Sequence, residues 1–175
     1  MNKTLRKLVY AALCVALALV LPLLTGQIPQ VGSMLSPMHI PVLLCGFICG
    51  PVWGLAVGAI SPLLRSLMFG MPPLFPTATA MAFELAAYGC SAGLLYKLFP
   101  KKAWGVYAAL ICAMLIGRAV WGAAMLSIMT ATGKGWGIDA FLAGAFINAW
   151  PGIILHIAII PPIVLALRKA KIIED

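Results

Sequence analysis

The chain has 175 residues, of which 63% are hydrophobic and only 9% are charged, whereas a soluble globular domain carries roughly 25% charged residues. A soluble fold of this size leaves much of its surface in water, so it could not bury this much apolar surface. The composition therefore excludes a soluble protein. Of the 12 Lys and Arg residues, all but Arg65 and Arg118 flank the apolar segments, as topology signals do, which argues against a nucleic-acid partner.

The first half of the chain predicts three membrane-spanning helices, each needing roughly 20 apolar residues to cross a ~30 Å hydrocarbon core. The first, at about 8–25, is longer than the apolar core of a signal peptide and has no cleavage site after it. Ser36-Pro37 has the residue types of a helix start, so the second span runs from there to about 49. Gly50-Pro51 is a turn signal, and the third span ends near 69.

Three more spans, at about 77–96, 103–129 and 139–167, complete the prediction of an all-α integral membrane protein with one domain over 1–175. Six spans place both termini and the 97–102 loop on one side, together with most of the basic residues. By the positive-inside rule that side is cytoplasmic. A five-span alternative, with 37–69 as one re-entrant unit, divides the basic groups between the two sides and fits the rule less well.

Polar side chains from five spans fall in the outer half of the bilayer when depth is counted at about 1.5 Å per residue. They are His39, Arg65, Glu84, Arg118 and Asn148. The same count places His156 deeper, toward the cytoplasmic half, so a metal site that uses both histidines is not expected. We predict an outer-side ligand pocket that is lined by the five residues of the outer half, His39, Arg65, Glu84, Arg118 and Asn148.

The charges of this pocket admit more than one interpretation. Arg65 alone could extend its head group to the membrane surface, and Glu84 could form a structural ion pair with either arginine. Such a pair would still leave the second arginine without a carboxylate among the spans. The two arginines, Arg65 and Arg118, exceed the single acid by one charge, and a substrate carboxylate would neutralise the surplus.

Aromatic residues near these charges are candidates for pocket walls. Tyr88 lies four residues after Glu84, and Trp121 lies three residues after Arg118 on nearly the same helical face. Trp150 is also too far inside the sixth span for an interfacial aromatic belt. A belt is the preferred interpretation for Trp104 and Trp136, which lie near span ends.

Two further patterns bear on partners and cofactors. Ala12 and Ala16 form an AxxxA stripe in the first span, where a second helix could pack closely. The sequence has no HExxH, GxSxG or P-loop motif. We therefore expect no metal or other cofactor in this chain and no enzymatic activity, and any ATP must be used by other subunits.

Two segments carry a family resemblance: "MHIPVLLCGFICGPVWGLAVGAISPLLRSL" over 38–67 and "AMAFELAAYGCSAGLLY" over 80–96. With six spans and the AxxxA stripe, the chain resembles the substrate-binding (S) components of bacterial energy-coupling factor (ECF) vitamin transporters. The resemblance covers essentially the whole chain. It implies a multi-pass protein of the bacterial plasma membrane that binds a vitamin or related micronutrient from outside.

The resemblance also implies partners and residue roles. An S component associates with a transmembrane coupling protein joined to two ATP-binding-cassette ATPases, so Ala12 and Ala16 would belong to the coupling face. The first outer loop, about 26–38, would close over a ligand held by spans four to six, which carry Glu84, Arg118 and Asn148. Arg65, on the third span, is less typical of the family.

The substrate and the class of function remain open at this stage. The surplus positive charge favours an anionic or zwitterionic micronutrient, with pantothenate first and folate or riboflavin next, because Trp121 and Trp150 could stack on a flat ring. A cationic substrate such as thiamine would instead make Glu84 its counter-ion. The alternatives are a small intramembrane enzyme that uses Glu84 or His156, and a scaffold protein without a ligand.

Overall fold

The computed structural model describes residues 2–25 and 28–173, and every regular element in these ranges is helical. The long helices are α1 (Lys3–Val20), α4 (Pro51–Phe69), α5 (Thr79–Leu98), α6 (Ala103–Ala131) and α8 (Trp150–Lys169). The shorter elements are η1 (Leu21–Thr25), α2 (Pro29–Leu35), α3 (His39–Cys49), η2 (Leu74–Ala78), α7 (Ile138–Leu142) and η3 (Ala143–Ile147). Five helical segments are long and apolar enough to cross a membrane, so the predicted all-helical membrane class is confirmed, while the count of six spans stays a prediction.

The predicted second span corresponds to α3, which has only 11 residues and is about 16 Å long at 1.5 Å per residue. Ser36 precedes it in the left-handed region, at φ 46°, and this conformation breaks the chain between α2 and α3. Gly50 ends α3 at φ 94°, a backbone geometry that a residue with a side chain rarely adopts. The second span is therefore a short helix bounded by two backbone breaks.

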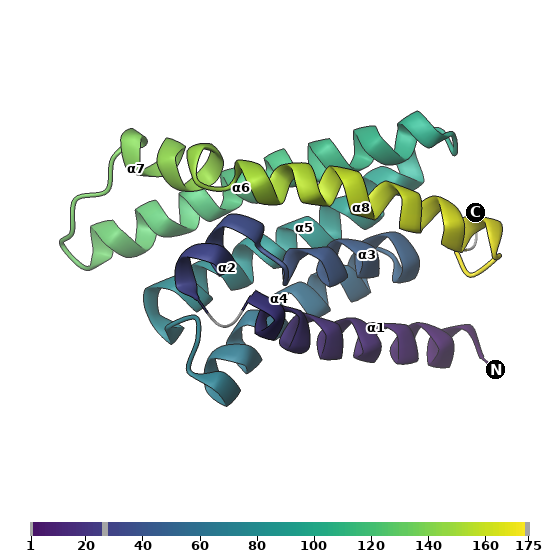
Figure 1. Ribbon diagram of the computed structural model, residues 1–175, viewed down its shortest axis with the longest axis horizontal. Coiled ribbons are helices and arrows are strands. Elements are labelled where there is room, and N and C mark those ends of the chain that lie inside the picture. The colour runs from purple at the N-terminus through teal and green to yellow at the C-terminus, as the bar shows by residue number, and fades with distance from the viewer. Residues whose placement is uncertain (1, 26–27, 174–175) are drawn as a thin grey trace.

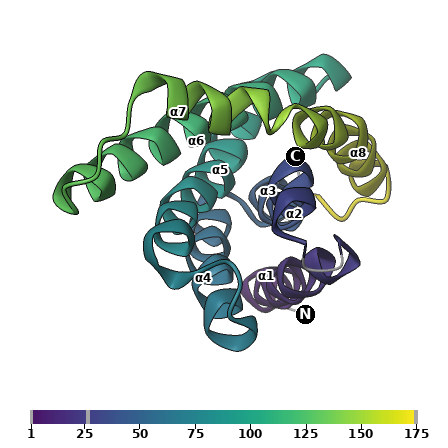
Figure 2. The same ribbon diagram turned by 60° about the vertical axis from the view of Figure 1, so that its left-hand side comes forward.

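The predicted sixth span, 139–167, is divided in the structure. The short helix α7 runs into the π-helical turn η3, and the long helix α8 begins only at Trp150. Pro151 lies in the first turn of α8, where its missing N–H costs no helical hydrogen bond. Figure 2 shows the chain changing direction between α7 and α8.

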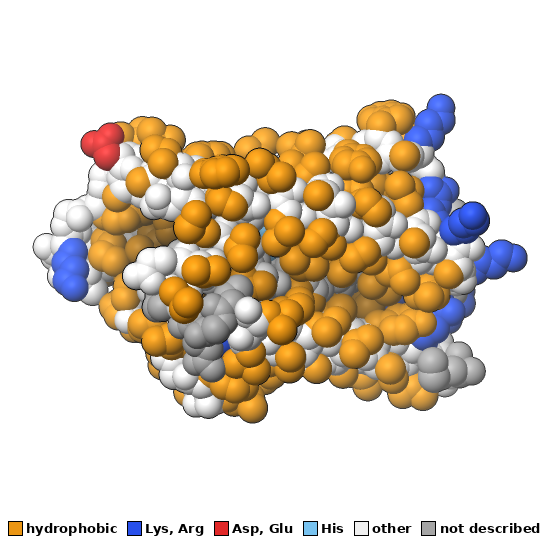
Figure 3. Space-filling view, viewed as in Figure 1, with side chains coloured by type: hydrophobic (Ala, Val, Ile, Leu, Met, Phe, Trp, Pro, Cys, Tyr) orange, Lys and Arg blue, Asp and Glu red, His pale blue; other side chains and the backbone are white. Residues whose placement is uncertain are grey.

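Both described ends of the chain lie at the same end of the helix bundle (Figure 1). Lys and Arg side chains gather at that end in Figure 3, whereas the α6–α7 connection, which contains Lys134, lies at the opposite end. This arrangement matches the distribution of charge expected from the sequence. We call the two ends of the molecule the basic end and the α7 end.

Helices α4 and α5 approach closely because glycines face each other between them. A side chain added at Gly54 would overlap the backbone of Gly89, and one added at Gly89 would overlap the backbone of Gly54. Such contact lets two helix backbones touch. It fixes α5 between α4 on one side and α6 on the other, and α5 carries the acidic residue of the site described next.

Candidate functional site

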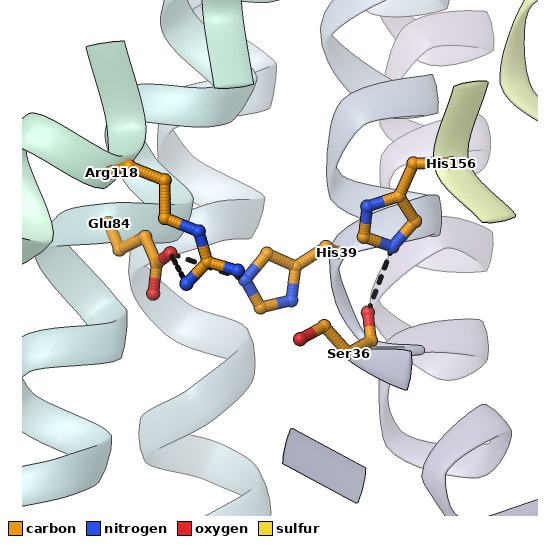
Figure 4. Close-up of polar contacts among 5 residues, drawn as sticks. All are labelled: Ser36, His39, Glu84, Arg118 and His156. Carbon is orange, nitrogen blue, oxygen red and sulfur yellow. Dashed lines mark hydrogen bonds and ion pairs between the residues drawn. The ribbon is translucent and has the colours of Figure 1, made fainter. Parts of the chain in front are cut away.

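Four buried polar side chains from four helices meet in the interior, as Figure 4 shows. We call this group the polar cluster; it consists of His39 on α3, Glu84 on α5, Arg118 on α6 and His156 on α8. Each of the four residues lies on a different helix, so the cluster forms only when these helices pack together. The chain connects them through long apolar segments, which place them in a low-dielectric surrounding.

The centre of the polar cluster is an ion pair. Arg118 Nη1 lies 2.9 Å from Glu84 Oε1, and the two side chains are only 11% and 2% exposed. A carboxylate this deeply buried is stable only when a cation or several hydrogen bonds compensate the loss of hydration. Arg118 provides that compensation.

Tyr88 and Gly117 set the spacing of α5 and α6 beside the ion pair. A Cβ atom added at Gly117 would lie 2.5 Å from the Tyr88 ring, so the ring fits against α6 only because position 117 is a glycine. Tyr88 is 1% exposed and lies one helical turn after Glu84. Its ring also meets the His39 ring edge-on, with centroids 5.2 Å apart.

The two histidines join the ion pair to α2 and α8. His39 Nε2 lies 3.6 Å from Glu84 Oε1, and the His39 ring stacks on the His156 ring with centroids 5.8 Å apart. His156 Nε2 lies 3.2 Å from the backbone carbonyl oxygen of Ser36. Because a carbonyl oxygen only accepts hydrogen bonds, this contact requires the proton on Nε2, and His156 thereby attaches α8 to the residue that follows α2.

Several polar atoms of the polar cluster are buried without a hydrogen-bond partner. They are both ring nitrogens of His39, Nε of Arg118 and Oε1 of Glu84, the last of which faces Arg118 Nη1 across the ion pair at 2.9 Å. Most buried polar atoms in native proteins are hydrogen-bonded, so each exception needs an explanation. A bound polar molecule would supply the missing partners, with an acceptor for the N–H of Arg118 and a donor or acceptor for His39.

Arg65 is not part of the polar cluster, contrary to the sequence-based expectation. It is 3% exposed, its Nη1 donates to the backbone carbonyl of Leu19, and its guanidinium carbon lies 5.1 Å from the Phe69 ring centroid. Pro22, three residues after Leu19, has no N–H to offer that carbonyl in the 3₁₀ turn η1. Arg65 thus joins α4 to the end of α1, and the predicted surplus positive charge is absent from the polar cluster.

The other predicted pocket residues are divided between two places. Tyr88 packs against the polar cluster, as described above. Trp121 instead lies in an aromatic group near the α7 end, 5.8 Å from the Trp136 ring and 6.3 Å from the Phe141 ring. Asn148 is exposed and Trp150 is 58% exposed, so the structure does not bring these two to the polar cluster.

His156 was placed at the wrong depth by counting residues. The count assumed one continuous helix over 139–167, which puts His156 far from the outer end. In the structure α8 starts at Trp150, so His156 lies six residues from its first residue, or about 9 Å. Pro151 in the segment "NAWPG" was the available signal for this helix start.

Metal binding and partner contacts complete the description of the predicted sites. Among residues 2–25 and 28–173, no group of three or more His, Cys, Asp or Glu side chains is arranged to hold a metal ion. Ala12 and Ala16 are exposed on α1, whereas Ala11, Cys14 and Ala18 of the same helix are buried. The AxxxA stripe therefore lies on the outer surface of the helix bundle.

Comparison with models of protein families gives one match, and it covers almost the whole chain. Residues 6–164 match the family described as ECF transporter, substrate-specific component. Comparison with curated proteins and with solved structures gives no match.

Proposed function

The chain belongs to the substrate-specific components of ECF transporters, and we propose that the polar cluster is where it binds its substrate. The family supports the function of a multi-pass membrane subunit of an ECF importer rather than that of an enzyme. ECF S components bind small-molecule substrates and work with a membrane coupling protein and two ATPases. In this proposal ATP is used by those ATPases, and this chain carries no cofactor.

The unpartnered nitrogens around the Glu84–Arg118 ion pair support this proposal more than any other feature. An ion pair that served only packing would have its remaining N–H groups bonded within the protein, since a half-satisfied buried network is costly. Here Arg118 Nε and both nitrogens of His39 remain available. These groups suit a small polar micronutrient with an acceptor for Arg118.

The charge of the site is weaker support for an anionic micronutrient than the sequence suggested, because Arg65 does not add its charge to the polar cluster. Glu84 already balances Arg118 in the polar cluster. A carboxylate can still accept from the Arg118 guanidinium, so pantothenate stays the first compound to test. Folate and riboflavin follow; riboflavin carries no carboxylate and tests whether hydrogen bonding alone is sufficient.

A thermal-shift screen of the purified protein against B vitamins tests the proposed function. A ligand that binds the folded state alone stabilises it by about 2.7 kcal/mol at 100 times its Kd, which raises the midpoint of unfolding clearly. The matched control is the double variant Glu84→Gln/Arg118→Met, which removes both charges together and should show no shift. If no vitamin stabilises the wild-type chain, the proposed substrate class is wrong.

The segment before α3 is proposed to cover the bound substrate. The family resemblance implies that the loop 26–38 closes over the ligand, and the structure describes α2 within this range. A side chain at Gly152 of α8 would begin 2.6 Å from the carbonyl oxygen of Met34, so α2 packs directly on α8. With the Ser36–His156 contact, this packing holds α2 beside the polar cluster.

The exposed stripe of Ala12 and Ala16 is proposed to contact the coupling protein. A bulky residue there prevents close approach of a second helix, so Ala16→Trp should abolish transport while vitamin binding by the isolated subunit persists. Ala123→Trp, at an exposed position of α6, is the matched control and should transport normally. Loss of binding with an intact complex would contradict this assignment.

We also propose six crossings with the basic end in the cytoplasm and the substrate entering from the α7 end. Cysteine labelling in a cysteine-free background measures this directly. A cysteine at position 101 should react only with reagent inside, and one at position 134 only with reagent outside. The reverse pattern would overturn the orientation.

A further inference from the structure

A second site is suggested by a cavity of about 400 Å³ at the basic end of the molecule. It lies between α1, α3 and α5 and is partly open. Its α3 wall is formed by residues 46–50, whereas His39 of the polar cluster lies at the other end of that helix. The α3 helix, about 16 Å long, separates the two places, so this cavity does not belong to the proposed vitamin site.

The cavity is lined by four cations from three segments of the chain. Arg6 and Lys7 come from α1, Lys97 from the last turn of α5, and Lys101 from the connection to α6. The residues that the structure describes around the cavity include no Asp or Glu. Lys7 and Lys97 place two positive charges on the wall of this space, and like charges around one space attract an anion.

Two of these cations have defined places. Lys101 donates from Nζ to the Tyr96 carbonyl oxygen at 2.6 Å, and the same nitrogen lies 3.7 Å from the Tyr96 ring centroid. The Lys97 Nζ lies 3.9 Å from the point where a side chain on Gly50 would begin. Gly50 turns the chain at positive φ, and the Lys97 ammonium group lies beside this turn.

Much of the remaining wall is apolar, with Tyr10 and Tyr96 among its residues. Phe47, Ile48 and Ile172 line the cavity together with the four cations. A cavity with positive charges and apolar walls, at the end of the bundle where Lys and Arg gather (Figure 3), lies where phospholipid head groups meet a membrane protein. Basic pockets between transmembrane helices bind anionic head groups.

We propose that this cavity binds the phosphate group of an anionic phospholipid, with Lys7 and Lys97 as principal contacts. The phosphate contributes the negative charge, and the glycerol and the start of the acyl chains lie against Phe47 and Ile172. The site is independent of the substrate, because no residue of the polar cluster lines it.

Native mass spectrometry of the full chain with added phosphatidylglycerol or phosphatidylcholine tests the proposal. The wild type should bind one phosphatidylglycerol at least tenfold more tightly than phosphatidylcholine. Lys7→Gln/Lys97→Gln should weaken phosphatidylglycerol binding about 25-fold, at roughly fivefold for each cation removed. The matched control, Lys102→Gln/Lys169→Gln, removes two basic residues of the same end that do not line the cavity, and it should change binding less than threefold.

Three outcomes would count against the proposal. Equal binding of the two lipids would overturn it, as would equal effects of the lining and control variants. Competition by glycerol phosphate or inorganic phosphate as strong as that by the whole lipid would retain phosphate recognition but overturn the lipid as its source. Thermal unfolding of both double variants without lipid shows whether each is folded.

Discussion

Two arginines lie buried in membrane-spanning helices of this protein, and their surroundings differ. Arg65 on α4 donates to a backbone carbonyl at the end of α1 and packs over Phe69. Arg118 on α6 faces the carboxylate of Glu84, and its Nε has no partner. Both occupy positions where an arginine is costly, but among the described residues only Arg118 has a fully buried guanidinium nitrogen without a hydrogen-bond partner.

The difference separates a structural arginine from a binding arginine. The Arg65 guanidinium donates a hydrogen bond to the Leu19 carbonyl, to which Pro22 has no N–H to donate. This bond stabilises the junction of α1 and α4. A guanidinium that is balanced in charge but incompletely bonded, with two histidines beside it, is prepared for a further polar partner. Intramembrane charge alone therefore does not identify the site; the unused atoms around it do.

Removal of the Arg118 guanidinium should have the largest effect on binding. Arg118→Ala leaves Glu84 buried without its cation, and truncating one member of a buried charge pair costs about 2–5 kcal/mol. We expect the vitamin that stabilises the wild type to bind at least about 100-fold more weakly, measured by isothermal titration calorimetry. Arg118→Lys should recover part of the affinity, because lysine keeps the charge without the planar fork.

Replacement of Arg65 should produce the opposite pattern. Arg65→Met removes a charge-assisted hydrogen bond to Leu19, worth about 1.5–3 kcal/mol, and should lower the midpoint of thermal unfolding by roughly 4–8 °C. Vitamin affinity should stay within about twofold of the wild type. A large loss of affinity together with an unchanged midpoint would show that the comparison of the two arginines is wrong.

The smallest effect is expected at His156, which contacts the Ser36 carbonyl and the His39 ring. His156→Phe keeps an aromatic ring but removes the hydrogen bond, so binding should weaken about fivefold, as for the loss of one neutral hydrogen bond of about 1 kcal/mol. His156→Gln can still donate to the carbonyl and should bind more tightly than the Phe variant. Equal affinities of the two variants would show that the hydrogen bond from His156 to the Ser36 carbonyl does not contribute to binding.

The sequence was sufficient to predict the membrane class, the family, and a partnership of Glu84 with an arginine. It did not determine which of the two arginines pairs with Glu84, because residue counting placed both Arg65 and Arg118 in the outer half of the bilayer. A sequence also does not show that the Leu19 carbonyl accepts a hydrogen bond from Arg65. It also separated His39 from His156, since depth counting treats a helix as continuous. Because the helix is broken before α8, the count from 139 does not give the position of His156, and the packing of α3 against α8 brings the two rings together.

The short length of α3 has a consequence for how the protein is made. A helix of 11 residues spans about half of a ~30 Å hydrocarbon core, so it does not resemble an independent insertion signal. The polar backbone at Ser36, between α2 and α3, must be sheltered by other protein segments because lipid offers it no hydrogen bonds. Of these segments α8, which supplies His156, is synthesised last. We therefore expect α3 to reach its final position only after α8, the last of these helices to be synthesised, has packed beside it.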